Sequence, residues 1–163
     1  MDRSPEDTRI EQLCEDLKCV VVARHETGGI GKAFLIAALT IGQSRNGITL
    51  FHYTAFYNIH HSLELLLKGV LGLPDIEKNH IHSLTKLMER NPDLVDGVFS
   101  ENEKELMARS DALNSDMGEL RYYKPPHKVF DWTLFVQLGE LGKRLVELDI
   151  TRNEPDQPSL SLM

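Results

Sequence analysis

The sequence is poor in cysteine and has no long apolar run, and each absence excludes a class of protein. Its two cysteines, Cys14 and Cys19, stand five positions apart in a helix-like segment, so their side chains point to different faces. We therefore expect buried or idle thiols rather than an internal disulfide. No uncharged apolar run reaches the roughly 18 residues that a membrane span needs, and the N-terminus, MDRSPEDTRI, is too charged for a signal peptide. These features predict a soluble, cytoplasmic protein without a membrane partner.

Basic residues are also in deficit. The chain has 18 Lys and Arg against 25 Asp and Glu, a formal net charge of -7. This balance argues against a broad electrostatic grip on nucleic acid, although a local basic site is compatible with it. With 163 residues and 41% hydrophobic content, the chain can bury one sizeable core. We expect a single domain over residues 1–150 and a disordered tail over residues 151–163, where two prolines interrupt a sequence without periodicity.

Several motifs for catalysis or metal binding are incomplete. The glycine-rich segment GGIGK at 28–32 lacks the first glycine and the Ser or Thr of a phosphate-binding loop. The segment HHSLE at 60–64 lacks the second histidine of a zinc-binding helix, so we predict no metal site and a hydrogen-bonded core role for His60. Capping and solvent exposure account for His80 and His82. No catalytic Ser-His-Asp or Cys-His set is evident, and no cofactor is predicted.

Helical periodicity is the strongest signal that the sequence does contain. The segment Phe51–Leu73 carries two adjacent apolar rows at i, i+3/i+4 spacing, which predicts a central helix buried around most of its circumference. Further helices are predicted from Ser4 to a stop at Gly28-Gly29, over Ile30–Ile41, over His82–Arg90, from Ser100 to Lys124, and from Asp131 to Ile150. Strands are nearly absent. The predicted fold class is therefore all-α, an antiparallel helical bundle of five or six helices.

Local signals mark the helix ends and one charged pair. Ser4, Ser100 and Asp131 are predicted N-caps, the second within a capping box. Gly139 and Gly142 flank the apolar row of the last helix and allow a close neighbour. Glu64 and Lys68 stand at the favourable i, i+4 spacing, either as an exposed pair or as a partly buried ion pair that fixes the register of the central helix.

Three segments together resemble the HEPN (higher eukaryotes and prokaryotes nucleotide-binding) domain family. They are YTAFYNIHHSLELLLKGVLGL, then HIHSLTKLMERN, then the long helix that reaches LRYYKPPH. The resemblance covers roughly residues 30–149 and rests on Glu64 with Lys68, on the order His82-Ser83-Leu84, and on an arginine followed by a histidine at a helix end. It implies a helical bundle that usually dimerises. Many members of this family are metal-independent endoribonucleases with an Arg and a His separated by four to six residues.

Arg121 and His127 fit that spacing, with five residues between them. Cleavage of RNA by attack of the ribose 2′-hydroxyl requires proton transfer and positive charge at the phosphorus. Histidine titrates near neutrality and can transfer the proton, and arginine offers a planar fork of donors to phosphate oxygens. A second pair can come from a twofold mate. The alternative interpretation is that Arg121 forms an ion pair with Glu119 or another acid and that His127 is an exposed loop residue.

The neighbouring residues leave a second function open. Tyr122, Tyr123 and Lys124 are candidate substrate contacts, since tyrosines stack on bases; core or interface packing is the alternative. Active HEPN members commonly have a polar residue directly after the arginine, where this chain has Tyr122. An Arg-Tyr pair resembles the family branch found beside nucleotidyltransferases, whose members are often non-catalytic. The chain is thus expected to be either a toxin or defence ribonuclease, with an antitoxin partner, or a module that binds a nucleotide or a nucleotidyltransferase-like protein.

Overall fold

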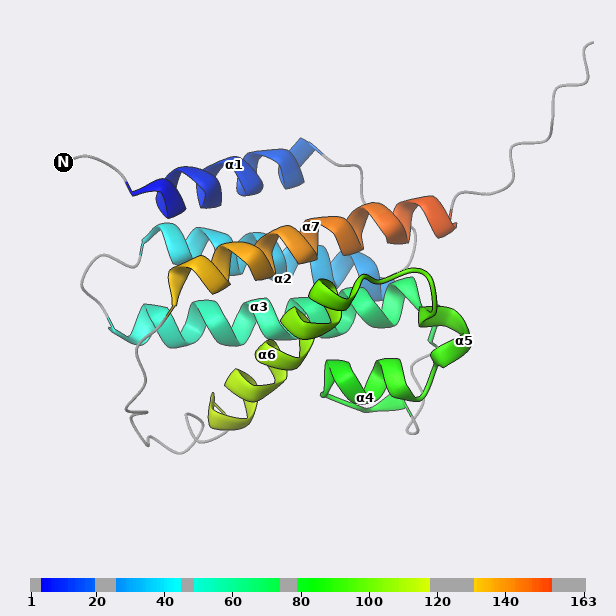
Figure 1. Cartoon of the computed structure of the whole chain (residues 1–163). Helices are drawn as coiled ribbons and strands as arrows, with labels where there is room; N and C mark the ends of the chain where they lie inside the picture. Colours follow the sequence, from blue (N-terminus) through cyan, green and yellow to red (C-terminus); the bar gives the residue numbers. More distant parts are fainter. Residues whose placement is uncertain (1–3, 20–25, 45–48, 74–78, 118–130, 154–163) are drawn as a thin grey trace, which may run out of the picture.

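The computed structural model of the chain describes residues 4–19, 26–44, 49–73, 79–117 and 131–153. Within these ranges there is no strand and there are seven helices (Figure 1): α1 (Pro5–Cys19), α2 (Glu26–Gln43), α3 (Thr49–Val70), α4 (Leu84–Glu89), α5 (Pro92–Val95), α6 (Glu101–Met117) and α7 (Trp132–Asn153). The predicted all-α bundle is confirmed. The predicted number of helices was too low because Pro92, expected only to end α4, also begins the single turn of α5.

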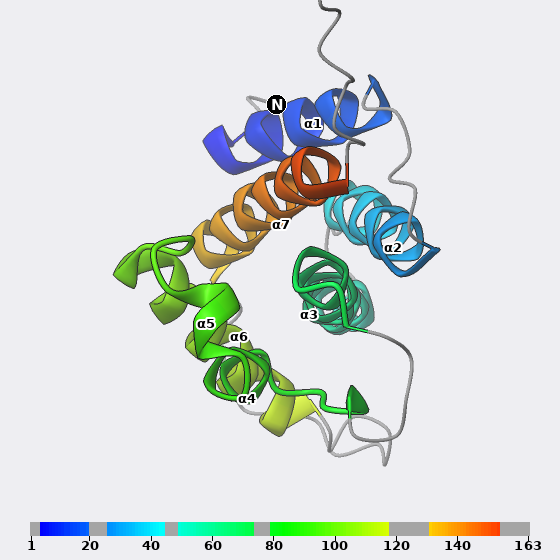
Figure 2. The same ribbon diagram turned by 90° about the vertical axis from the view of Figure 1, so that its right-hand side faces the viewer.

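The helices fall into two groups (Figures 1 and 2). The helices α1, α2, α3 and α7 pack along one another, and α1, α2 and α3 alternate in direction. The shorter α4 and α5, together with α6, lie on one side of this four-helix group, next to α3 and α7. Among the described helices, none combines the length and the apolarity needed to cross a lipid bilayer.

The central helix predicted over Phe51–Leu73 is α3, with its ends shifted by a few residues. It contacts α2, α4, α6 and α7. Its main apolar row is at most 3% exposed and consists of Phe56, Ile59, Leu63, Leu66 and Val70. Burial of such a row stabilises the fold by about 1.5–3 kcal/mol for each large side chain. A helix surrounded in this way holds the other elements in register.

A Schellman motif ends α3 at its C-terminus. Gly72 has a φ of 63°, a left-handed conformation that favours glycine. The N–H of Gly72 donates to the carbonyl of Gly69 at 3.0 Å, and the N–H of Leu73 donates to the carbonyl of Lys68 at 3.0 Å. These bonds satisfy two carbonyls that the end of the helix leaves without partners.

The prediction that Gly28-Gly29 stops the first helix is wrong. The first helix ends at Cys19, and both glycines lie within α2. Close packing between α2 and α3 accounts for glycine here: a Cβ atom on Gly69 would lie 3.4 Å from the Cα atom of Gly28, and one on Gly31 would lie 3.0 Å from the backbone nitrogen of Leu66. This tertiary contact outweighs the roughly 1 kcal/mol by which glycine disfavours a helix relative to alanine.

The close approach predicted at Gly139 and Gly142 is confirmed. A Cβ atom on Gly142 would lie 2.8 Å from Cδ2 of Leu35, and one on Gly139 would lie 3.1 Å from Cδ1 of Leu13. Both glycines are on α7, so they bring this helix against α2 and α1. Cys14 is buried and Cys19 is exposed, and both are free thiols, as predicted.

The predicted N-caps are also confirmed. Ser4 Oγ accepts from the N–H of Asp7 at 3.1 Å. Ser100 forms a complete capping box with Glu103 through bonds of 2.8 and 3.2 Å. Asp131 Oδ1 accepts from the N–H groups of the second and third residues that follow it, at 3.0 and 3.2 Å. The helix α7 runs to Asn153, so the tail predicted from Thr151 begins too early; residues 154–163 lie outside the described ranges.

Candidate functional site: a polar junction of α3, α4 and α6

A buried carboxylate joins α3 to the segment that precedes α4. Glu64 is 3% exposed, and its Oε1 lies 2.6 Å from Nζ of Lys68 on the next turn. Nδ1 of His82 lies 3.2 Å from Glu64 Oε2, and Nδ1 of His61 lies 3.7 Å from the same oxygen. The partly buried ion pair is thus the correct alternative for Glu64 and Lys68. The side chain of His82 is 75% exposed, as expected, but its contact with Glu64 was not predicted.

The surroundings of Glu64 keep its carboxylate ionised. Burial alone would raise the pKa of this group, because a low-dielectric environment disfavours the charged form. The polar contacts with His61, Lys68 and His82, with the positive charge of Lys68, outweigh burial and lower the pKa to about 2. Glu64 is therefore a fixed negative charge at this junction and not a proton donor near neutral pH.

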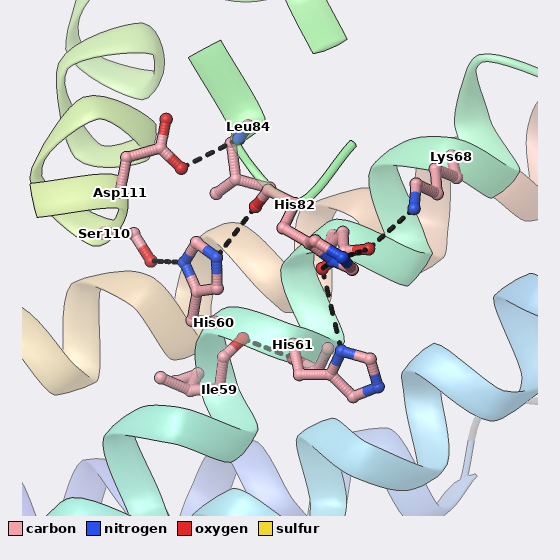
Figure 3. A network of polar contacts seen from close by, with 10 residues as sticks. Ile59, His60, His61, Lys68, His82, Leu84, Ser110 and Asp111 are labelled. Atoms are coloured by element: carbon pink, nitrogen blue, oxygen red, sulfur yellow. Dashed lines mark hydrogen bonds and ion pairs between the residues drawn. The ribbon is translucent and has the colours of Figure 1, made fainter. Parts of the chain in front are cut away.

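The imidazole of His60 connects three elements through its two ring nitrogens. Nε2 lies 3.1 Å from the carbonyl oxygen of His82, and Nδ1 lies 2.9 Å from Oγ of Ser110 on α6 (Figure 3). Because a carbonyl can only accept, Nε2 carries the proton and Nδ1 accepts from the Ser110 hydroxyl. Burial lowers the pKa of His60, which favours this neutral form. The predicted role as a hydrogen-bonded core residue is confirmed.

The N-terminus of α4 is capped from α6. Asp111 accepts from Leu84 N at 2.8 Å, from Thr85 N at 2.9 Å and from Oγ of Ser83 at 2.8 Å. Ser83 is itself the N-cap of α4 and accepts from Lys86 N at 3.2 Å. The helix predicted over His82–Arg90 is thus α4, and two side chains satisfy its first backbone donors.

An open pocket of about 550 Å³ lies beside this junction. Its described lining combines the segment before α4, the outer face of α4 and one face of α6, and it consists of His80, Ile81, His82, Ser83, Lys86, Arg90, Asp111 and Asn114. Lys86 and Arg90 are exposed cations on successive turns. Four of these lining residues were not predicted from the sequence: Lys86, Arg90, Asp111 and Asn114. The one local signal for them is the i, i+4 spacing of two like charges in HIHSLTKLMER.

The described part of the chain contains no group of three or more His, Cys, Asp or Glu side chains arranged to hold a metal ion. The two candidates that the sequence offered for metal binding are otherwise engaged. Both ring nitrogens of His60 contact Ser110 and His82, and Glu64 contacts Lys68. These side chains instead fix the positions of α3, α4 and α6.

The residues predicted for catalysis and substrate contact lie outside the described ranges. They fall in residues 118–130, between the end of α6 at Met117 and the start of α7 at Trp132, and comprise Arg121, Tyr122, Tyr123, Lys124 and His127. Comparisons of the chain with models of known protein families, with curated proteins and with solved structures found no match. A function for this chain must therefore be inferred from its own residues.

Proposed function

We propose that this chain is a HEPN-like protein that acts in the cytoplasm as a metal-independent endoribonuclease. One observation carries the proposal: two of the segments on which the resemblance rests, Glu64 with Lys68 and the segment of His82, meet in one ion-paired cluster. His82 and Glu64, which are in contact, are separated by 18 positions in the sequence. The tertiary fold, and not helical spacing, therefore brings the two segments together. The third part of the resemblance, Arg121 and His127, follows the helix whose Asp111 caps α4.

In the proposed reaction, the ribose 2′-oxygen forms a bond to the adjacent phosphorus and the bond from phosphorus to the 5′-oxygen breaks. Arg121 binds the phosphate oxygens and offsets the charge that develops on them. His127 transfers a proton, either accepting it from the 2′-hydroxyl or donating one to the leaving 5′-oxygen. The products are a 2′,3′-cyclic phosphate and a 5′-hydroxyl, and the reaction requires no metal ion.

A homodimer completes this scheme, because proton transfer at both oxygens needs two groups. A twofold interface brings identical patches together, so the second Arg121 and His127 pair comes from the other copy. Such a ribonuclease is a hazard to its own cell, which is consistent with a toxin or defence role and with an antitoxin partner. Tyr122, Tyr123 and Lys124 lie between the two catalytic residues and contact the RNA strand.

A non-catalytic module is the second candidate, and Tyr122 favours it. This residue directly follows Arg121, at the position where active HEPN members commonly have a polar side chain. In this alternative the chain binds a nucleotide or a nucleotidyltransferase-like protein and performs no chemistry itself. The acidic net charge of -7 fits a protein partner better than a long nucleic acid.

The deciding experiment incubates the purified chain with a mixed-sequence single-stranded RNA in the presence of EDTA. We expect the wild type to release fragments with cyclic-phosphate ends, and Arg121→Ala and His127→Ala to release none. Arg9→Ala is the matched control, since it removes an exposed arginine that pairs with Glu140 at 2.7 Å, and it should cleave normally. If the wild type leaves the RNA intact at high protein concentration, the ribonuclease proposal fails and the binding module replaces it.

A further inference from the structure

Lys86 and Arg90 have no carboxylate partner among the residues that the structure describes, unlike seven other cations of the chain. Ion pairs with Asp or Glu engage Arg9, Lys18, Lys68, Lys104, Arg109, Lys143 and Arg144. Within the same ranges, no carboxylate contacts Lys86 or Arg90, although the chain has 25 acidic residues against 18 basic ones. In so acidic a chain, two cations one helical turn apart that have no carboxylate partner among the described residues need an explanation.

Stability does not explain this pair. Lys86 and Arg90 are four positions apart on α4 and at its C-cap, and like charges at this spacing destabilise a helix. The partial negative charge at the C-terminal end of a helix attracts cations. In a helix of only six residues this charge is small, and one cation would be enough to offset it. The arrangement is better suited to a ligand that carries negative charge.

The other polar groups of the pocket are already engaged or are donors. Asp111 is the acidic residue of the described lining, and it accepts three hydrogen bonds from Ser83 Oγ and from the first N–H groups of α4. The Ser83 hydroxyl donates to Asp111 and accepts from Lys86 N. The positively charged donors of this wall are the Lys86 ammonium and the Arg90 guanidinium, and the Asn114 amide and the imidazoles of His80 and His82 also line it.

We propose that this pocket binds a phosphate group, supplied by an RNA strand or by a free nucleotide. Arginine offers phosphate a planar fork of donors, and lysine offers a point charge. No Phe, Tyr or Trp is among the described residues that line the pocket, so these residues offer a phosphate stronger contacts than they offer a base. Recognition is therefore of the phosphate and is independent of base identity. The site does not require catalysis by Arg121 and His127.

Binding can be measured without cleavage by using a labelled single-stranded RNA whose 2′-hydroxyls are methylated, because the attacking group is then blocked. Fluorescence anisotropy would compare the wild type with the double variant Lys86→Gln/Arg90→Gln and with the control Lys104→Gln, which removes a lysine paired with Glu101 at 2.8 Å. Unlabelled AMP and adenosine serve as competitors that differ only in the phosphate. The charge-preserving variant Lys86→Arg/Arg90→Lys tests whether charge, and not packing, is responsible.

We expect the double variant to bind the RNA at least about tenfold more weakly than the wild type. The slope of log K against the logarithm of the salt concentration should become less steep by about 0.7 for each phosphate contact that is lost. Lys104→Gln and the charge-preserving variant should bind nearly as well as the wild type. Competition by AMP but not by adenosine would identify phosphate as the recognised group. Binding of AMP in a direct calorimetric titration, by a wild type that does not bind the RNA, would identify a free nucleotide as its source. Equal binding by the wild type and the double variant, or no binding of either ligand by the wild type, would overturn the proposal.

The same assay separates this site from the proposed catalysis. His127→Ala should still bind the methylated RNA while it no longer cleaves the unmodified strand. A wild type that binds through Lys86 and Arg90 but never cleaves RNA would refute the ribonuclease alone. A wild type that cleaves RNA while the double variant binds normally would refute the phosphate pocket alone.

Discussion

The four-helix group of α1, α2, α3 and α7 is held together differently from the junction of α3, α4 and α6. In the first region, glycines such as Gly31 and Gly142 let apolar helices approach closely. In the second, the buried Glu64 and His60 and the partly buried Asp111 add specific polar contacts between the elements. The stability of the first region depends on the small side-chain volume at the helix contacts, and that of the second depends on specific hydrogen-bond donors and acceptors. The two regions should therefore respond to different substitutions.

This difference matters most for α4. A helix of six residues is far too short to be stable alone, since isolated helices of fewer than about 12–15 residues are marginal in water. Three buried leucine and methionine side chains anchor it, and Asp111 and Ser83 set its direction. The positions of Lys86 and Arg90 in the pocket thus follow from the polar junction.

The largest effect is expected for Glu64→Gln, which breaks the central ion pair of the polar junction. Loss of one partner leaves Lys68, whose side chain is only 13% exposed, without its counter-charge. We expect a loss of about 3 kcal/mol of unfolding free energy at neutral pH, measured by urea denaturation. Glu101→Gln is the control, because its carboxylate pairs with Lys104 but is 90% exposed, and it should lose at most about 1 kcal/mol. Equal losses would mean that the junction contributes no more than a surface pair.

The same variant should alter the response to acid. The pKa of Glu64 falls from 4.5 to about 2 on folding, so between these values the unfolded chain binds a proton that the folded chain does not. This contribution is fully present above about pH 5 and is lost as the pH falls toward about 2. His60, whose pKa is lowered below 6.5, adds a loss that begins near pH 6.5. Denaturation across this range should show both losses in the wild type and only the upper one in Glu64→Gln.

An intermediate effect is expected for Gly31→Ala in the four-helix group. The added Cβ atom would lie 2.9 Å from Cγ and 3.0 Å from the backbone nitrogen of Leu66, and a backbone atom cannot rotate away. Overpacking of this kind costs about 1–3 kcal/mol. Gly139→Ala is the matched comparison, because its new atom would meet the flexible side-chain ends of Leu13 and Leu39 at 3.1 and 3.2 Å. Thermal unfolding of both variants tests this; a Gly139→Ala variant that is the less stable would contradict it.

The smallest global effect is expected for Asp111→Asn. The amide keeps one acceptor oxygen but loses the charge and the second oxygen that Thr85 N and Ser83 Oγ share. We expect a loss of about 1 kcal/mol, with faster hydrogen exchange at the backbone amides of α4. Asp93→Asn, at an exposed position of α5, should leave those amides unchanged. Unaltered exchange in Asp111→Asn would show that apolar packing alone holds α4.

Only those contacts of the polar junction that lie within one helix could be predicted from the sequence. Glu64 and Lys68 are one turn apart, so helical periodicity alone brought them together. His82 and Asp111 contact residues 18 and 27 positions away, at Glu64 and Leu84, and no local pattern specifies such a meeting. The pocket was not predicted for the same reason, because its described lining combines α4, the segment before it and the sequence-remote α6. The roles of Arg121 and His127 stay predictions.

By itself, the sequence determined where several helices begin, because caps such as Ser4, Ser100 and Asp131 form hydrogen bonds within three residues of their own position. The sequence also determined that α3 is central, because its two adjacent apolar rows require burial around most of the helix circumference. Only the tertiary structure decided the rest. Gly28 lies within a helix, at a point where α3 packs closely against α2. The short α4 took its place because Asp111, remote in sequence, supplies the acceptors that its first turn needs.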